Sequence, residues 1–185
     1  MPVLIQELNG IDTAALRRTM QEISANPETG MASFGVTTAW KGGTRTETRV
    51  KGWSLGGTPI PKDFTISIDE PHELLGGNTA PNPQEFLLAS MNACMVATYV
   101  AACSMQGIEL ESVTIESGGT LDLRGFLGLD KSVKPGYDEL SYTLRVRGSG
   151  TREQYERVLA WMESTSPNYW NMANAIRMKS RLVVD

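Results

Sequence analysis

Cys94 is the residue of this 185-residue sequence with the strongest case for chemistry, because it lies in the middle of a long apolar segment. A cysteine thiolate is a nucleophile, but its reactivity requires an electropositive and partly open environment. A free cysteine buried among apolar side chains instead behaves as a small hydrophobic residue. The sequence leaves both roles open for Cys94, and a catalytic thiol is the leading hypothesis.

The second cysteine, Cys103, is a weaker candidate. It follows Cys94 by nine residues, which on a helix is a rotation of about 900° and a rise of about 13 Å. The two side chains are therefore expected on opposite faces, beyond the roughly 7 Å between Cα atoms that a disulfide allows. We expect Cys103 to be a core residue that does not pair with Cys94.

Other residues of chemical interest carry weaker signals. His72 is the only histidine, and without clustered cysteine or carboxylate ligands it predicts neither a metal site nor a triad. The loop over residues 76–81 lacks the Lys-Ser/Thr ending of a phosphate-binding loop, so its glycines are expected to shape a turn. Arg45 and Arg49 lie in a polar strand, where most arginines are solvated, although either could face a thiolate. No cofactor and no metal are predicted.

The segment around Cys94 carries the signals of one long helix. Asn82 is a good N-cap, Pro83 suits the first helical position, and Glu85 can reach back to the cap. Gly107 is the expected C-terminal stop. The roughly 24 residues between these caps predict a helix about 36 Å long, which is the width of a small domain.

This predicted helix is apolar nearly all round, because no charged residue lies between Phe86 and Met105. Such a helix is expected to be buried on all sides. Its length would also suit a membrane span. Against a span, it is rich in alanine and serine, its near flanks lack lysine and arginine, and no aromatic belt brackets it. We therefore predict a central helix of a soluble protein, with small residues that let a second helix approach closely.

The rest of the chain predicts strands in two groups on either side of this helix. Apolar periodicity also predicts a short helix after Asp12 and a second long helix after Thr151, which opens a capping box. Strands grouped in meanders, not alternating with helices, indicate the α+β class. We expect a helical arm over residues 1–30 and a main domain over residues 31–185. The predicted strands cover residues 32–40, 44–53, 63–69, 113–115, 120–123, 140–146 and 177–184.

Composition narrows the partners and the compartment. The net charge of −4 gives no reason to expect a nucleic-acid partner. Two cysteines without a pairing pattern argue against a disulfide-stabilised secreted protein, and the first residues lack the basic start and apolar core of a signal peptide. We therefore expect a cytoplasmic protein.

Several motifs in order resemble one known family. Residues 76–88 read Gly-Gly-x-x-x-Pro-Asn-Pro-x-Glu-x-Leu-Leu, and Asn-Ala-Cys follows at residues 92–94. The likeness continues through residues 107–110 and the paired strands to a second helix that ends in a Ser-Pro pair at residues 166–167. The sequence is thereby similar to the osmotically inducible protein C / organic hydroperoxide resistance (OsmC/Ohr) superfamily over roughly residues 32–185. Its N-terminal helical extension indicates a divergent OsmC-like branch.

This resemblance implies an α+β fold in which two chains intertwine as a homodimer. Each chain contributes a long buried central helix to a shared core, together with a second helix and antiparallel sheets. It also implies reduction of organic hydroperoxides by a cysteine pair in the oxidative stress response. One cysteine on the central helix becomes a sulfenic acid, and a second cysteine resolves it as a disulfide. An arginine and a glutamate orient and activate the first thiolate.

The family's functional residues carry over only in part. Cys94 matches the peroxidatic position, but Ser166 stands where the resolving cysteine is expected. Gln84 replaces the activating glutamate, while Glu85 fills the next position, which is also usually acidic. Arg45 matches the family's arginine with a shift of one residue. Two of the four functional positions therefore have changed chemistry.

Two functions of different class follow from this pattern. The first is a one-cysteine hydroperoxide reductase, in which Cys94 reacts with the peroxide and an external thiol reduces the sulfenic acid. The second is a protein that kept the fold but binds a small apolar molecule at the dimer interface, with Cys94 in a structural role. The changed residues Ser166 and Gln84 motivate the second hypothesis.

Overall fold

The structure is a computed structural model that describes residues 7–184, and the chain divides into two compact units. The first unit covers residues 1–87 and the second covers residues 88–185. The class is mixed helix and sheet with antiparallel strand pairing, so the predicted α+β class is confirmed.

The first unit begins with a short strand pair and the helix that the sequence predicts after Asp12. The Asp12 carboxylate accepts a hydrogen bond from the Ala15 amide at 2.8 Å, which caps the helix. At the other end the chain leaves the helix at Asn26, just before Pro27. The elements are β1 (Glu7–Leu8), β2 (Ile11–Asp12), α1 (Thr13–Ala25) and the 3-10 turn η1 (Pro27–Gly30).

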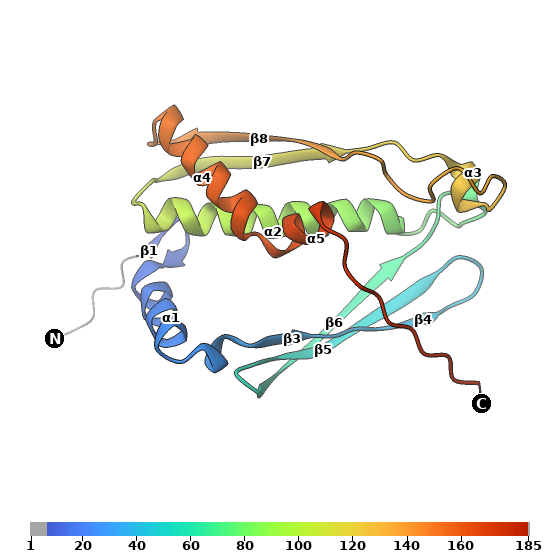
Figure 1. Ribbon diagram of the computed structural model, residues 1–185, viewed down its shortest axis with the longest axis horizontal. Helices are drawn as coiled ribbons and strands as arrows, with labels where there is room; N and C mark the ends of the chain where they lie inside the picture. Colours follow the sequence, from blue (N-terminus) through green and yellow to red (C-terminus); the bar gives the residue numbers. More distant parts are fainter. Residues whose placement is uncertain (1–6, 185) are drawn as a thin grey trace. The chain divides into compact units, whose positions relative to one another are not determined.

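A four-stranded antiparallel sheet follows, where the period-two pattern predicts three strands, because the predicted strand over residues 32–40 is two separate strands. The long strand β5 pairs along its length with β6, and its other edge pairs with β3 and β4 in turn. In Figure 1 the β5–β6 hairpin is the longest part of this sheet. The strands are β3 (Ala32–Phe34), β4 (Thr37–Trp40), β5 (Thr46–Leu55) and β6 (Thr58–Ile68).

The loop after β6 is tied to a buried carboxylate, that of Asp69. Its side chain accepts hydrogen bonds from the Thr44 hydroxyl at 2.7 Å, the Thr79 hydroxyl at 2.8 Å and the Gly77 amide at 3.1 Å. The same segment contains the 3-10 turn η2 (His72–Leu74). These bonds shape the loop that leads into the central helix.

The second unit is built on the long helix α2 (Pro83–Met105), whose first turn belongs to the first unit. In Figure 1 the hairpin of β7 and β8 runs along α2, and α4 crosses the same helix. Tyr99, Met95, Val158 and Met162 are fully buried between these elements. The remaining elements are β7 (Leu110–Gly118), α3 (Leu123–Phe126), β8 (Ser141–Gly148), α4 (Arg152–Thr165) and α5 (Pro167–Ala173).

Within the second unit α2 is covered on one face only. Its buried residues include Met91, Met95 and Tyr99, which recur at a spacing of four, whereas Ala89, Ala93 and Ala97 are exposed on another face. Among the described residues α2 is the one helix long and apolar enough to cross a membrane. Core helices of soluble proteins share that length and composition, so this likeness is weak support for a span.

Two predicted strands are absent. Residues 120–122 are irregular and residue 123 begins α3, because the Asp122 side chain accepts a hydrogen bond from the Arg124 amide at 2.9 Å and caps that short helix. Residues 177–184 are neither helix nor strand. A strand is stable only when a neighbour pairs with its backbone, and no strand in the described part of the chain does so here.

Candidate active site at Cys94

Cys94 and Ser166, 72 residues apart in the chain, lie side by side in the second unit. The Ser166 hydroxyl donates a hydrogen bond to the Cys94 sulfur, with Oγ and Sγ 3.5 Å apart. Ser166 is fully buried, whereas Cys94 as a residue is only partly buried. The structure thus brings together the predicted peroxidatic residue and the residue at the predicted resolving position.

Ser166 is held at this place by the junction between α4 and α5. Its amide donates to the Met162 carbonyl at 2.8 Å, and its carbonyl accepts from the Trp170 amide at 3.0 Å. A serine that precedes a helix usually uses its hydroxyl to cap the first turn. Ser166 makes no such capping bond, because its hydroxyl is directed to Cys94.

Cys103 lies apart from this pair, as the sequence predicts. It is fully buried on α2, and burial raises the pKa of its thiol to about 11. Both cysteines are free thiols. A thiol that stays protonated at neutral pH is a poor nucleophile, so Cys103 is a core residue, whereas Cys94 is only partly buried.

Gln84 and Glu85 lie in the first turn of α2. The Glu85 carboxylate accepts a hydrogen bond from the Asn82 amide at 2.8 Å, and the Asn82 side chain accepts one from the Glu85 amide at 2.8 Å. This is the reciprocal cap that the sequence predicts. Gln84 is exposed. At 1.5 Å per residue both positions lie about 13 to 15 Å along the axis from Cys94, so within one chain neither side chain touches its sulfur.

Arg45 and Arg49 have partners within the first unit. The Arg45 guanidinium donates to the Lys41 carbonyl at 3.3 Å and lines a polar pocket of about 260 Å³ that also includes Thr79. Arg49 forms an ion pair with Glu47, with Nε and Oε1 3.0 Å apart. A role for either arginine toward Cys94 stays a prediction.

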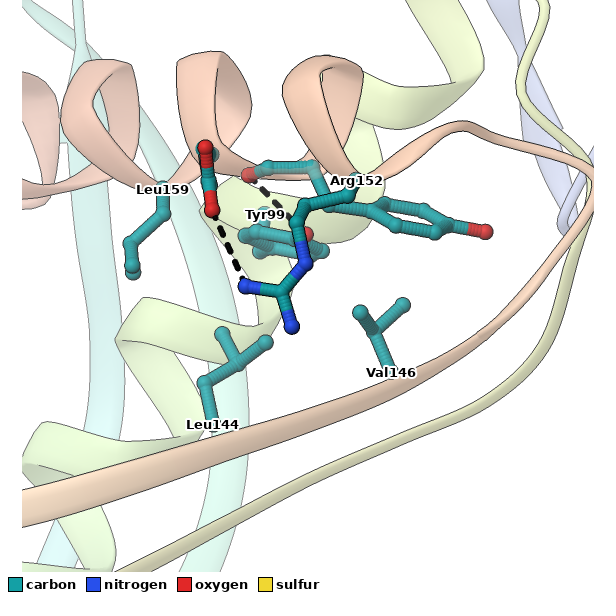
Figure 2. Close-up of a pocket in the computed structure, with 7 residues that line it drawn as sticks. Tyr99, Leu144, Val146, Arg152 and Leu159 are labelled. Carbon is teal, nitrogen blue, oxygen red and sulfur yellow. Dashed lines mark hydrogen bonds and ion pairs between the residues drawn. The ribbon is translucent and has the colours of Figure 1, made fainter.

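A separate pocket of about 330 Å³, lined by both apolar and charged side chains, lies beside β8 and α4. Figure 2 shows Tyr99, Leu144, Val146 and Leu159 around it, with the Arg152 guanidinium among them. Arg152 pairs with Glu156 at 3.2 Å. Because Arg152 and Ser166 mark opposite ends of α4, about 20 Å apart by helix length, this pocket is not part of the Cys94 site.

The described residues, 7–184, contain no group of three histidine, cysteine or acidic side chains that could hold a metal ion. The single histidine, His72, lies in an exposed turn with its Nδ1 3.0 Å from the Gly76 carbonyl oxygen. The chemistry that this geometry allows at Cys94 is that of a thiol beside a buried hydroxyl.

Comparisons with known proteins agree with this architecture. A family model described as OsmC-like protein matches residues 76–181. The structure is similar to the crystal structure of an OsmC-like protein from Mycoplasma pneumoniae, with a TM-score of 0.61 at 13% identity over 76% of this chain and 87% of that one. It is also similar to an OsmC-like protein of unknown function from Vibrio cholerae, with a TM-score of 0.54 at 16% identity over 75% of this chain and 92% of that one. No protein of curated function matches the sequence.

Proposed function

Because the chain belongs to the family of OsmC-like proteins, we propose that it is a thiol-dependent hydroperoxide reductase of one-cysteine type, with Cys94 as the reacting residue. The observation that carries the proposal is the hydrogen bond from the buried Ser166 hydroxyl to the partly buried Cys94 sulfur. This contact gives the sulfur a polar neighbour, unlike a cysteine that packs only among apolar side chains. The thiolate is the form that attacks a peroxide.

In the first step the Cys94 thiolate attacks one oxygen of an organic hydroperoxide. A sulfur–oxygen bond forms and the oxygen–oxygen bond breaks, so that the sulfur is oxidised to a sulfenic acid and the peroxide is reduced to an alcohol. The alkoxide that leaves takes up a proton to become that alcohol. Ser166 can keep its hydrogen bond to the sulfur group throughout, since no atom of the serine is consumed.

The second step requires a thiol from outside the chain. Ser166 cannot form a disulfide, and Cys103 is buried elsewhere on α2. An external thiol therefore condenses with the sulfenic acid to give a mixed disulfide and water. A second external thiol then releases the Cys94 thiol and leaves as the external disulfide. We infer a cytoplasmic setting, where such thiols are kept reduced.

The test is a stoichiometric oxidation of the reduced protein with one equivalent of cumene hydroperoxide. We expect rapid loss of one thiol and a gain in mass of one oxygen atom, unchanged in Cys103→Ser and abolished in Cys94→Ser. Because Cys103→Ser alters a fully buried residue, its fold is checked by circular dichroism. Oxidation of Cys94 no faster than that of free cysteine would refute the peroxidase.

The second candidate function is that of a non-peroxidase that binds a small apolar molecule at a dimer interface. The exposed face of α2 with Ala89, Ala93 and Ala97 favours it, since an apolar helix face is otherwise left to water. It predicts that an apolar fluorescent probe binds equally well to the wild type and to Cys94→Ser. Loss of probe binding in an oxidised Cys94 protein would instead tie the ligand to the thiol.

A further inference from the structure

A second polar contact lies next to the pair of Cys94 and Ser166. The Asn168 side-chain amide donates a hydrogen bond to the Ser90 carbonyl, with Nδ2 and O 2.9 Å apart. Ser90 precedes Cys94 by four residues, so their positions lie one above the other on the same face of α2. Ser166, the N-cap of α5, and Asn168, its second residue, thus contact two successive turns of α2.

The hydrogen bond between Ser166 and Cys94 depends on where α5 lies relative to α2. The Ser166 hydroxyl is 3.5 Å from the sulfur, so a displacement of about 1 Å would break the bond. Its own backbone bonds fix the junction relative to α4 and α5 but not relative to α2. The apolar side chains of α5 pack on the core of the second unit, as in the edge-to-face contact of Tyr169 with Tyr142. Apolar packing is non-directional, whereas a hydrogen bond defines a position.

We propose that Asn168 is a positioning residue, which fixes α5 on α2 so that the Ser166 hydroxyl points at the Cys94 sulfur. The effect of this positioning on catalysis rests on the proposed function. The positioning itself does not, because it concerns only where position 166 lies relative to Cys94. Asn168 contacts neither the thiol nor the hydroxyl in the hydrogen bonds that the structure shows.

The experiment measures this geometry without any peroxide. In Ser166→Cys we expect the two sulfurs to form a disulfide. Ser166 Oγ and Cys94 Sγ are 3.5 Å apart, and a small side-chain rotation closes that distance to the about 2 Å of a sulfur–sulfur bond. Equilibration with reduced and oxidised glutathione transfers two electrons from the two protein thiols to glutathione disulfide, which yields two reduced glutathiones. The equilibrium constant reports the effective concentration of one thiol at the other.

Three further substitutions are then compared in the Ser166→Cys background. Asn168→Ala removes the side-chain amide, Asn168→Asp keeps its shape but cannot donate when ionised, and Asn171→Ala is a control at an exposed position of the same short helix. We expect both changes at Asn168 to lower the effective concentration about three- to tenfold, the size of one hydrogen bond. Asn171→Ala should leave it unchanged.

Each other result overturns the positioning role. An unchanged constant in Asn168→Ala would show that apolar packing alone places position 166. A loss in Asn168→Ala but not in Asn168→Asp would assign the effect to shape and not to the donated bond. An equal loss in Asn171→Ala would mean that α5 responds to any substitution. Since the readout contains no peroxide, a failed peroxidase assay would leave these outcomes interpretable.

Discussion

At the scale of single residues, one atom of Ser166 matters most for the proposed chemistry. Ser166 stands at the predicted resolving position, and its hydroxyl is 3.5 Å from the Cys94 sulfur. Oxygen in place of sulfur keeps a hydrogen-bond donor but removes the possibility of a disulfide. In the proposed cycle the same contact places a hydrogen-bond donor beside Cys94 and makes an external reductant necessary.

A second residue with a defined electrostatic role is Asp69, which is 1% exposed. Hydrogen bonds from the Thr44 and Thr79 side chains hold the pKa of its carboxyl well below the usual range. The amides of Glu70, Gly77 and Thr79 also donate to it. All of the hydrogen-bond partners of Asp69 are donors. An asparagine side chain at this position would place its own N–H donors against those donors, and hydrogen bonds would be lost.

We therefore predict that Asp69→Asn lowers the melting temperature at pH 7. Because the pKa of Asp69 is lowered on folding, its stabilisation is complete above the ordinary carboxyl pKa of about 4 and is lost as the pH falls toward the folded value. The difference in melting temperature between Asp69→Asn and the wild type should thus be smaller at pH 3 than at pH 7. Melting curves at both pH values test this, with Asp63→Asn on the exposed part of β6 as the control. A difference that does not depend on pH would contradict the electrostatic cause.

At the scale of elements, the loop into α2 explains why two glycines begin the motif at residues 76–88. A Cβ atom at Gly76 would lie 1.7 Å from the Glu70 carbonyl oxygen, and one at Gly77 would lie 2.9 Å from Asp69 Oδ2. The clash at Gly76 is with a backbone oxygen, which cannot move aside as a flexible side chain can. The glycines allow the loop to fold back on residues 69–70 before the helix starts.

We predict that Gly76→Ala destabilises the protein by more than about 2 kcal/mol, because the backbone must shift to relieve the clash. Gly35→Ala is the matched control, since a Cβ atom there meets nothing within 4 Å. Urea unfolding of both variants gives the comparison. A Gly76→Ala protein as stable as Gly35→Ala would show that the loop rearranges at little cost.

At the scale of the whole molecule, large apolar side chains are left uncovered within one chain. Phe34, Trp40 and Phe64 of the four-stranded sheet are 76%, 74% and 62% exposed. Large apolar side chains left exposed to water favour an interface in soluble proteins. Together with the exposed small residues of α2, this exposure supports the proposal of an intertwined homodimer. A separate helical arm over residues 1–30 stays a prediction.

The homodimer predicts a mass twice that of one chain by light scattering at micromolar concentration. Ala93 lies in the middle of the exposed face of α2, so Ala93→Arg would place a charge where a second helix must approach closely. We expect this variant to be monomeric, because an unpaired buried charge is costly. Ala160→Arg, at an exposed position of α4, should stay dimeric. A monomeric wild-type protein would refute the interface.

The sequence by itself determined the elements whose signals are local. The caps at Asp12, Asn82 and Thr151 act on residues within one helical turn, so the helices they begin were predictable from neighbouring residues. The period-two pattern likewise predicted β5, β6 and β8. The resemblance to the OsmC family rested on ordered motifs, and the family model and the fold agree with it.

Only the tertiary structure decided the contacts between distant residues. Ser166 meets Cys94 across 72 positions and Asn168 meets Ser90 across 78, and no local pattern encodes either pairing. Asn168 was missed for this reason, since an asparagine after a Ser-Pro pair has no distinctive signal. The alternating pattern over residues 177–184 predicted a strand that the structure does not contain. A strand needs a pairing partner, and pairing depends on the whole fold and not on the segment alone.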